Sequence, residues 1–265
     1  IRKDLQAHCD RYNLMKTWFI LFMAFCNGTA PQIYERTDPH GFVFYADHPT
    51  LEIPGLLYRS NYVSKEEEAE LLALIDGRPW NHDIARRTQY YGYTYYHTRQ
   101  NIETMQPVEQ PETHTGNLED MDFLMQRLIA DDFFPVDHPP TQVLVNEYLN
   151  NMSIKGHLDN VDAFGDVIIS LSLNAPAYMT MRSCEDPNQV MKVFMEERSV
   201  LVMSGDARFH WRHGITRQKQ VYIPTTSDII KRDDTYRRVS LTIREIKVDG
   251  TKKVQSGDDD RERKF

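Results

Sequence analysis

The chain has 265 residues, 40% of them hydrophobic, which is enough for one substantial domain with a buried core and shorter extensions. Its formal charge of −8 argues against a protein that coats nucleic acid electrostatically but does not exclude a local basic cleft. Three cysteines without paired spacing make a disulfide framework unexpected and favour a reducing, intracellular compartment: nucleus, cytoplasm or mitochondrion.

Residues 1–50 are predicted to form an aromatic-rich N-terminal extension. The apolar run WFILFMAFC, residues 18–26, is about half as long as a membrane-spanning helix, so no membrane partner is expected. Basic residues precede the run and a glycosylation pattern follows it at residues 27–29, but Asp4 and Asp10 dilute the positive charge. We expect a buried helix here, with a targeting or membrane-associated element as the alternative.

Two helices are predicted before the main run of strands. In residues 62–77, Ser64 can cap a helix with Glu67 three positions later, and Gly77 follows its end. Its buried face would comprise Leu71, Leu72 and Ile75. A second helix is expected near residues 118–130, where apolar residues recur at helical spacing.

From residue 141 the pattern changes to short β-branched runs separated by turn-forming residues. The runs cover residues 141–149, 166–173, 189–195, 198–204 and 237–246. Short strands late in the chain, preceded by helices, predict an α+β fold with a β-sandwich or jelly-roll core buttressed by helices. Residues 251–265 are charged and poor in apolar side chains, so a disordered tail is expected.

His157 and Asp159 stand two positions apart in an extended segment and therefore project to the same side. With His213 as a third ligand, they would leave three positions open on an octahedral ion, an arrangement typical of non-haem Fe(II) oxygen chemistry. A structural zinc site would instead close with four protein ligands. An H-x-D pair also occurs by chance, and His210 is a competing ligand that would face away from His213 on an extended strand.

The run RRVSLTIREI places Arg238, Ser240, Thr242 and Arg244 on one face of a strand. A buried guanidinium requires an anionic partner, and a carboxylate matches its geometry best. The two arginines are about 20 Å apart along the strand, so a small dicarboxylate between them is a better ligand than a single carboxylate. For Arg244, a surface salt bridge with a neighbour such as Glu245 is the alternative.

Together these motifs resemble the AlkB family of Fe(II)- and 2-oxoglutarate-dependent dioxygenases, over about residues 51–247. The family pattern appears in order: N-x-Y at Asn146 and Tyr148, the H-x-D pair, VIISLSLN, GDAR at residues 205–208, H-G-I at His213, and R-x5-R. Two departures are a turn LNNMSIKG where relatives usually have Pro-Gly, and Asn174 where they commonly have glycine.

The resemblance implies a double-stranded β-helix core within a dioxygenase domain at residues 51–250. It implies that His157, Asp159 and His213 bind Fe(II), with O2 as the oxidant. It implies that Arg238 binds the distal carboxylate of 2-oxoglutarate and that Arg244 lies near the end that chelates iron. Supporting roles in binding 2-oxoglutarate fall to Asn146, Tyr148 and Ser240, the last at a position where relatives often have Asn.

The resemblance also implies a nucleotide-recognition lid at about residues 80–117. Within it, Arg86, Arg87 and Arg99 could contact phosphates, and tyrosines such as Tyr91 and Tyr93 could stack on bases. The alternative is an ordinary tyrosine-rich hairpin whose rings face the core. The segment RRTQYYGYTY resembles the eukaryotic branch that includes the AlkB domain of the tRNA wobble-uridine hydroxylase.

The implied function is oxidative demethylation or hydroxylation of a modified nucleobase in DNA or RNA, as in DNA repair or RNA modification. A base inside a duplex must leave the stack before such chemistry, so single strands, loops or flipped bases are the expected partners. Two alternatives are the same oxygenase chemistry on a protein side chain and a non-catalytic binding module. The intact ligand set and both arginines argue against the module. The oligomeric state does not follow from the sequence.

Overall fold

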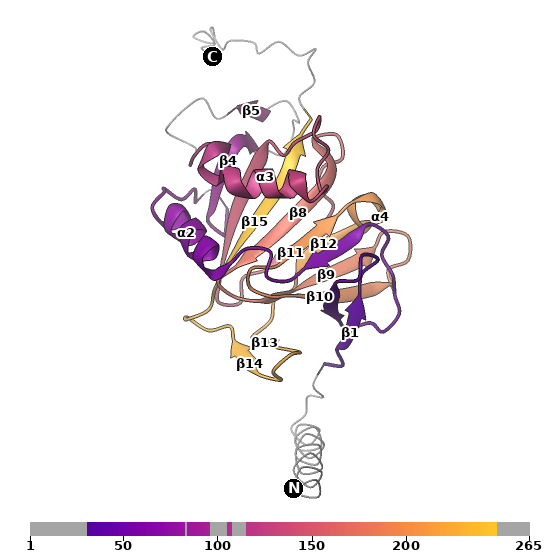
Figure 1. Cartoon of the computed structure of the whole chain (residues 1–265). Coiled ribbons are helices and arrows are strands. Elements are labelled where there is room, and N and C mark those ends of the chain that lie inside the picture. Colours follow the sequence, from indigo (N-terminus) through magenta and orange to yellow (C-terminus); the bar gives the residue numbers. More distant parts are fainter. Residues whose placement is uncertain (1–30, 83, 96–104, 108–114, 248–265) are drawn as a thin grey trace, which may run out of the picture.

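The structure, a computed structural model, describes residues 31–82, 84–95, 105–107 and 115–247. These residues form two sheets of antiparallel strands that pack face to face, with helices on the outer face of the larger sheet (Figure 1). The predicted α+β class with a double-stranded β-helix core is confirmed. The predictions for the apolar run at 18–26, for Arg99 and for the tail at 251–265 lie outside the described residues.

The larger sheet has seven strands in the order β3-β11-β8-β15-β6-β4-β5. They span Leu56–Arg59 (β3), Val200–Met203 (β11), Phe164–Leu173 (β8), Arg237–Ile246 (β15), Gln142–Leu149 (β6), Thr88–Tyr95 (β4) and Met105–Pro107 (β5). Four of these strands, β6, β8, β11 and β15, coincide with predicted runs. They are rich in β-branched residues and mostly buried, so their sequence signal is strong.

The smaller sheet has six strands in the order β1-β2-β10-β9-β12-β7. They span Tyr34–Thr37 (β1), Val43–Ala46 (β2), Val190–Met195 (β10), Ala177–Ser183 (β9), Trp211–Ile215 (β12) and Ile154–His157 (β7). A separate hairpin joins Gln220–Tyr222 (β13) to Ile229–Lys231 (β14). Of the six, β10 was predicted, whereas β9 and β12 have too few β-branched residues to be recognised.

The predicted boundary at residue 50 does not coincide with an edge of the fold. Strand β2, which lies in the predicted extension, pairs with β10, and its residues Phe44 and Ala46 are buried between the two sheets. The described part of the extension is therefore part of the β-core. Strands β1 and β2 have four residues each, too few for period-two alternation to be recognised in the sequence.

Both predicted helices are present. Helix α2, Lys65–Asp76, begins with a capping box: the Ser64 hydroxyl accepts from the Glu67 amide at 3.1 Å, and the Glu67 carboxylate accepts from the Ser64 amide at 2.8 Å. Gly77 follows the helix as predicted. The second helix begins as a 3-10 turn, η2 Leu118–Met121, and continues as α3, Asp122–Ala130. A short helix, α4 Gly205–Phe209, precedes β12. None of the described helices is long and apolar enough to cross a membrane.

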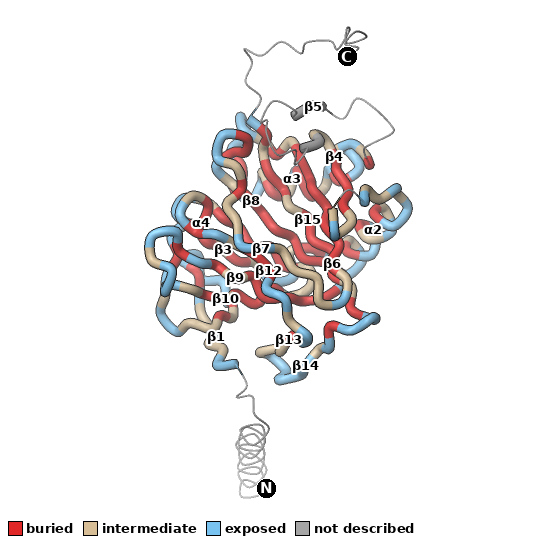
Figure 2. The backbone as a smooth tube through the Cα atoms, turned by 180° about the vertical axis from the view of Figure 1, so that it is seen from behind, coloured by how far each residue is buried: buried red, intermediate tan, exposed pale blue. Residues whose placement is uncertain are grey.

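The side chains of strand β15 alternate between the two faces of the larger sheet. Its Val239, Leu241 and Ile243 pack in a core cluster with residues of α2 and α3. The alternating residues, Arg238 to Arg244 at even positions, share one face as predicted, and this face is directed at the smaller sheet. Figure 2 shows that the buried residues are concentrated in the strands of the two sheets, whereas the exposed ones lie mainly in the connections. The polar side chains of β15 on this inner face indicate where the candidate functional site lies.

Candidate functional site: a cavity between the two sheets

A cavity of about 760 Å³ opens between the sheets. Its wall includes most of the residues singled out in the sequence: Arg86, Asn146, Tyr148, His157, Asp159, His213, Arg238, Ser240 and Arg244. Strands β6, β8 and β15 supply one side, and β7 and β12 the other. Residues that are up to 158 positions apart, Arg86 and Arg244, thus meet at one site.

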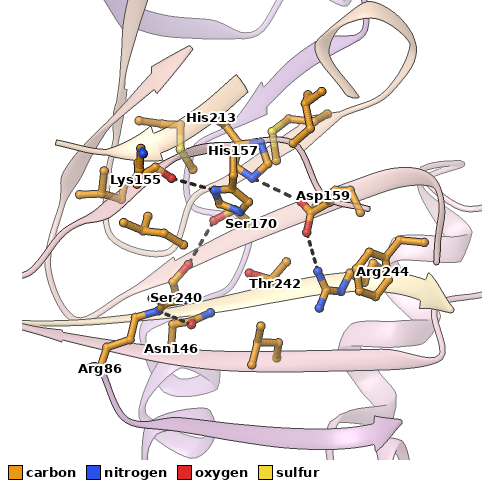
Figure 3. A pocket seen from close by; sticks show the side chains of 18 of the residues that line it. Arg86, Asn146, Lys155, His157, Asp159, Ser170, His213, Ser240, Thr242 and Arg244 are labelled. Atoms are coloured by element: carbon orange, nitrogen blue, oxygen red, sulfur yellow. Dashed lines mark hydrogen bonds and ion pairs between the residues drawn. The ribbon is translucent and has the colours of Figure 1, made fainter. Parts of the chain in front are cut away.

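His157, Asp159 and His213 converge as predicted (Figure 3). Each residue offers one ligand atom, and these atoms all lie within 4.8 Å of one another, close enough to share one metal ion. The two imidazoles are cross-strand partners on β7 and β12, with ring centroids 4.5 Å apart. The strands approach closely because residue 214 is glycine: a Cβ there would lie 2.8 Å from the Gly156 amide nitrogen.

The Asp159 carboxylate is buried and charged. Its Oδ1 accepts from a guanidinium nitrogen of Arg244 at 2.5 Å, whereas the buried Oδ2 has no hydrogen-bond partner among the described residues and lies 3.3 Å from Nε2 of His213. Burial alone would raise the pKa of Asp159, but contact with His213 and the charge of Arg244 hold that pKa below its usual range. A buried anionic oxygen without a donor fits a bound cation.

His157 is oriented by its own strand. Its Nδ1 lies 3.0 Å from the carbonyl oxygen of Lys155, which can only accept, so Nδ1 carries the proton and Nε2 keeps its lone pair. Burial, followed by the neighbouring His213, lowers the pKa of His157. A lowered pKa favours the neutral imidazole, which is the form that binds a metal ion.

Arg238 is a buried cation on the opposite wall. Its side chain is 1% exposed, and no acid among the described residues lies within ion-pairing distance. One terminal nitrogen donates to the Ser172 hydroxyl at 2.7 Å, and the guanidinium lies 5.4 Å from the Tyr148 ring centre. Its buried Nε has no hydrogen-bond partner in the described part of the chain. Burial lowers the pKa of Arg238. A guanidinium so placed fits a carboxylate inside the cavity.

Arg244, unlike Arg238, forms an ion pair with an acid among the described residues, Asp159. Besides Asp159, it donates through Nε to the Gln142 side-chain oxygen at 2.8 Å, and its guanidinium lies 3.5 Å from the Phe164 ring centre. The alternative of a surface salt bridge with Glu245 is wrong, because Arg244 is 3% exposed and Glu245 contacts His138 instead. Gln142 was not recognised in the sequence, although even spacing places it on the same face of β6 as Asn146.

Among the predicted substrate-binding residues, Arg86 lines the cavity. Its Nε donates to the side-chain oxygen of Asn146 at 2.7 Å, and its guanidinium lies 5.9 Å from the Tyr148 ring centre. Arg86 thus joins the segment before β4 to the N-x-Y residues of β6. The exposed Lys155 of β7, which the sequence did not single out, borders the same cavity.

The predicted substrate roles of Arg87 and Tyr91 need correction. Arg87 projects to the opposite face, where it forms an ion pair with the buried Glu147 and lies 4.4 Å from the Trp80 ring centre. Tyr91 is fully buried in the core beneath the helices, and its hydroxyl donates to the Gln89 side-chain oxygen at 3.1 Å. The core-facing alternative therefore holds for Tyr91.

Tyr93 and His210 also lie outside the cavity wall. Tyr93 packs against the core between the sheets, on the other face from Tyr91, because Gly92 has a φ of +79° that breaks the alternation. A Cβ at Gly92 would lie 2.3 Å from the Thr141 carbonyl oxygen. His210 ends α4, is exposed and faces Glu185 at 3.7 Å, so it is not part of the metal cluster.

Residues 55–244 match the family model of the 2OG-Fe(II) oxygenase superfamily. An "Alkylated DNA repair protein ALKBH8 homolog" of Arabidopsis thaliana is 30% identical over 213 residues, which is 74% of this chain and 60% of that protein. The "tRNA (carboxymethyluridine(34)-5-O)-methyltransferase ALKBH8" of Macaca fascicularis is 30% identical over 177 residues, which is 63% of this chain but 25% of that protein. The chain thus spans less than two thirds of these relatives.

Among solved structures, OsALKBH1 superimposes with a TM-score of 0.51 over 74% of this chain and 100% of that chain, at 18% identity, which supports the fold. The superfamily uses Fe(II), 2-oxoglutarate and O2, and the His157, Asp159 and His213 cluster fits a metal ion. The chain therefore belongs to the Fe(II)- and 2-oxoglutarate-dependent oxygenase superfamily, and its relatives at 30% identity include proteins named as ALKBH8 or its homologue.

Proposed function

We propose that the chain is a dioxygenase that oxidatively demethylates or hydroxylates a modified nucleobase in single-stranded or flipped-out nucleic acid. One observation carries the proposal: within the described ranges, a His-Asp-His cluster whose carboxylate has one oxygen without a hydrogen-bond donor shares a cavity with a buried arginine that has no acidic partner. The first requires a cation and the second an anion, and Fe(II) and 2-oxoglutarate satisfy both.

The two walls of the cavity would then bind different groups. His157, Asp159 and His213 hold Fe(II), which with 2-oxoglutarate and O2 supplies the oxidation of a C–H bond. Arg238 binds the distal carboxylate of 2-oxoglutarate, and the Ser172 hydroxyl orients the guanidinium. Arg244 fixes the rotamer of Asp159 so that one carboxylate oxygen stays directed at the metal.

The remaining cofactor-binding residues lie between these two ends. Ser240 accepts from Arg238 at 3.3 Å and lies 3.2 Å from the Ser170 hydroxyl, so it links Arg238 to β8. Asn146 and Tyr148 line the same wall on β6 and support the co-substrate there.

Three features support a nucleobase as the oxidised substrate. Relatives named for DNA repair and for tRNA modification share the matched domain. The cavity of about 760 Å³ is large enough for a small dicarboxylate together with one base. Arg86 and Lys155 place positive charge on its wall, suited to a phosphate next to an extruded base.

The test incubates the protein with Fe(II), 2-oxoglutarate and O2 together with methylated oligonucleotides, total tRNA or cell-extract protein. We expect formaldehyde, or the mass of one added oxygen atom, in a nucleic-acid sample. Product in the protein sample alone would replace the proposed substrate with a protein side chain. Succinate from none of the samples would contradict a dioxygenase altogether.

Arg86 and Arg87 offer a matched pair for this experiment. Arg86→Gln should raise KM for the nucleic acid, because it removes positive charge from the cavity wall. Arg87→Gln should leave that KM near the wild-type value and instead lower the Tm, because it weakens the pairing of the buried Glu147. An equal rise in KM for both variants would contradict the assignment of the cavity-facing residue.

A further inference from the structure

The smaller sheet carries basic residues on the face that points away from the cavity. Arg212 on β12 and Arg182 on β9 are exposed register partners. Their neighbours His213 and Met181 face inward, so the two arginines face outward by alternation. On the other side of β12 lies the edge strand β7, with Lys155 next to the cavity mouth. We call Lys155, which borders the cavity mouth, together with the outward-facing Arg182 and Arg212 the outer basic strip.

The outer basic strip lacks acidic partners. None of its three members forms an ion pair with a described acid, in a chain with 39 acidic and 31 basic residues. Arg182 donates to the Pro187 carbonyl at 2.6 Å, which does not neutralise its charge. Like charges directly opposite each other on antiparallel strands are destabilising, so an anion between Arg182 and Arg212 would relieve a local repulsion.

The acids that follow β2 and those in the β9–β10 connection contact other groups: the Asp186 carboxylate accepts from the Asn188 amide at 2.9 Å. Asp47 lies 3.8 Å from Lys192, and Glu185 lies 3.7 Å from His210. On the β7 side of Arg212 stands Gly156, whose position carries no side chain to cover the guanidinium; a Cβ there would lie 4.0 Å from the Arg212 Cβ. The surface between the cavity mouth and Arg212 is therefore open to a polyanion.

We propose that the outer basic strip binds phosphates of the single-stranded nucleic acid that flanks the base inserted in the cavity. This inference rests on the proposed function and adds a second contact surface to it. The strip crosses three adjacent strands, which are about 4.8 Å apart. The nucleic-acid backbone passes Lys155 at the mouth, crosses the edge strand β7 and reaches Arg212 and then Arg182 on the outer face.

The test measures binding of fluorescein-labelled oligo(U) and oligo(dT) of about 12 nucleotides by anisotropy at several salt concentrations. The double variant Arg182→Gln/Arg212→Gln should lower the slope of log K against log salt by about 1.4, because each phosphate contact contributes about 0.7 in single strands. That change corresponds to about 25-fold weaker binding in about 0.1 M salt. The double variant Arg182→Lys/Arg212→Lys keeps the charges and should keep the slope.

Lys65→Gln serves as the charge-matched control for the single variant Arg212→Gln. Lys65 is exposed at the start of α2, on the helix-covered face of the other sheet (Figure 1). An unchanged slope in the arginine double variant, or an equal loss of affinity in Lys65→Gln and Arg212→Gln, would overturn the inference. Neither result bears on the proposed function, which is judged by product formation from modified nucleic acid.

Discussion

Arg238 and Arg244 lie on the same face of β15, yet their replacement by methionine should change stability in opposite directions. Arg238 is a buried cation without an acidic partner among the described residues. Arg244 neutralises the buried Asp159. Methionine approximates the length of either side chain and removes the charge.

The magnitudes follow from these partners. Arg238→Met removes the desolvation penalty of a buried ion, several kcal/mol, but loses its hydrogen bonds to Ser172 and Ser240, so it should stabilise the metal-free protein by about 1 to 4 kcal/mol. Arg244→Met should destabilise it by about 3 to 5 kcal/mol, because Asp159 would then be a buried charge without its partner. Loss of Arg238 should also weaken 2-oxoglutarate binding by about 2 to 5 kcal/mol, or from about 30-fold to several thousand-fold.

The assay is thermal unfolding of the metal-free proteins with and without 2-oxoglutarate, supported by calorimetric titration. For Arg238→Met we expect a Tm above that of the wild type, by roughly 2 to 4 °C per kcal/mol, and no further rise with 2-oxoglutarate. If Arg238→Met lost as much stability as Arg244→Met and kept the full response to 2-oxoglutarate, the assignment of Arg238 as an anion site would be refuted.

Three further predictions concern the metal cluster and helix α2. Gly214→Ala should lower the affinity for Mn(II), a non-reactive substitute for Fe(II), about 10- to 100-fold, because the new Cβ forces β7 and β12 apart. Gly156→Ala is the control, because its Cβ would lie 4.0 Å from the nearest atom, and it should bind Mn(II) normally. Equal losses of affinity in an isothermal titration would refute the role of Gly214 in the approach of the two strands. Mn(II) at about 100 times its Kd should stabilise the wild type by about 2.7 kcal/mol, and Asp159→Asn should abolish this rise in Tm; a retained rise would place the ion elsewhere. The hydrogen bond from Arg127 lowers the pKa of Glu67 from 4.5 to about 2. The folded-state pKa is thus below the unfolded one, so the stabilisation is present above about pH 4.5 and is lost as the pH falls towards 2. Glu67→Gln can keep the capping box without the charge, so its deficit in urea unfolding should shrink over that window; a constant deficit would contradict this origin.

The alternation of β15 was available from its sequence because it depends on local backbone geometry. Consecutive side chains of an extended strand point to opposite faces, so Arg238, Ser240 and Arg244 had to share one face wherever the strand lay. The same rule joined His157 to Asp159. The order and spacing of these motifs also indicated the family, which supported His213 over His210 as the third ligand. The capping box that begins α2 was equally local.

Other features depended on the pairing of distant segments. Arg86 and Arg87 precede β4 and project to opposite faces, and which one reaches the cavity follows from the register of β4 on β6. The four-residue strand β2 became part of the core when it paired with β10. Local geometry sets which residues lie together on a face. Only the assembled sheets decide which face is buried and which residue of a neighbouring pair meets the ligand, because burial and register are created by residues far apart in the chain.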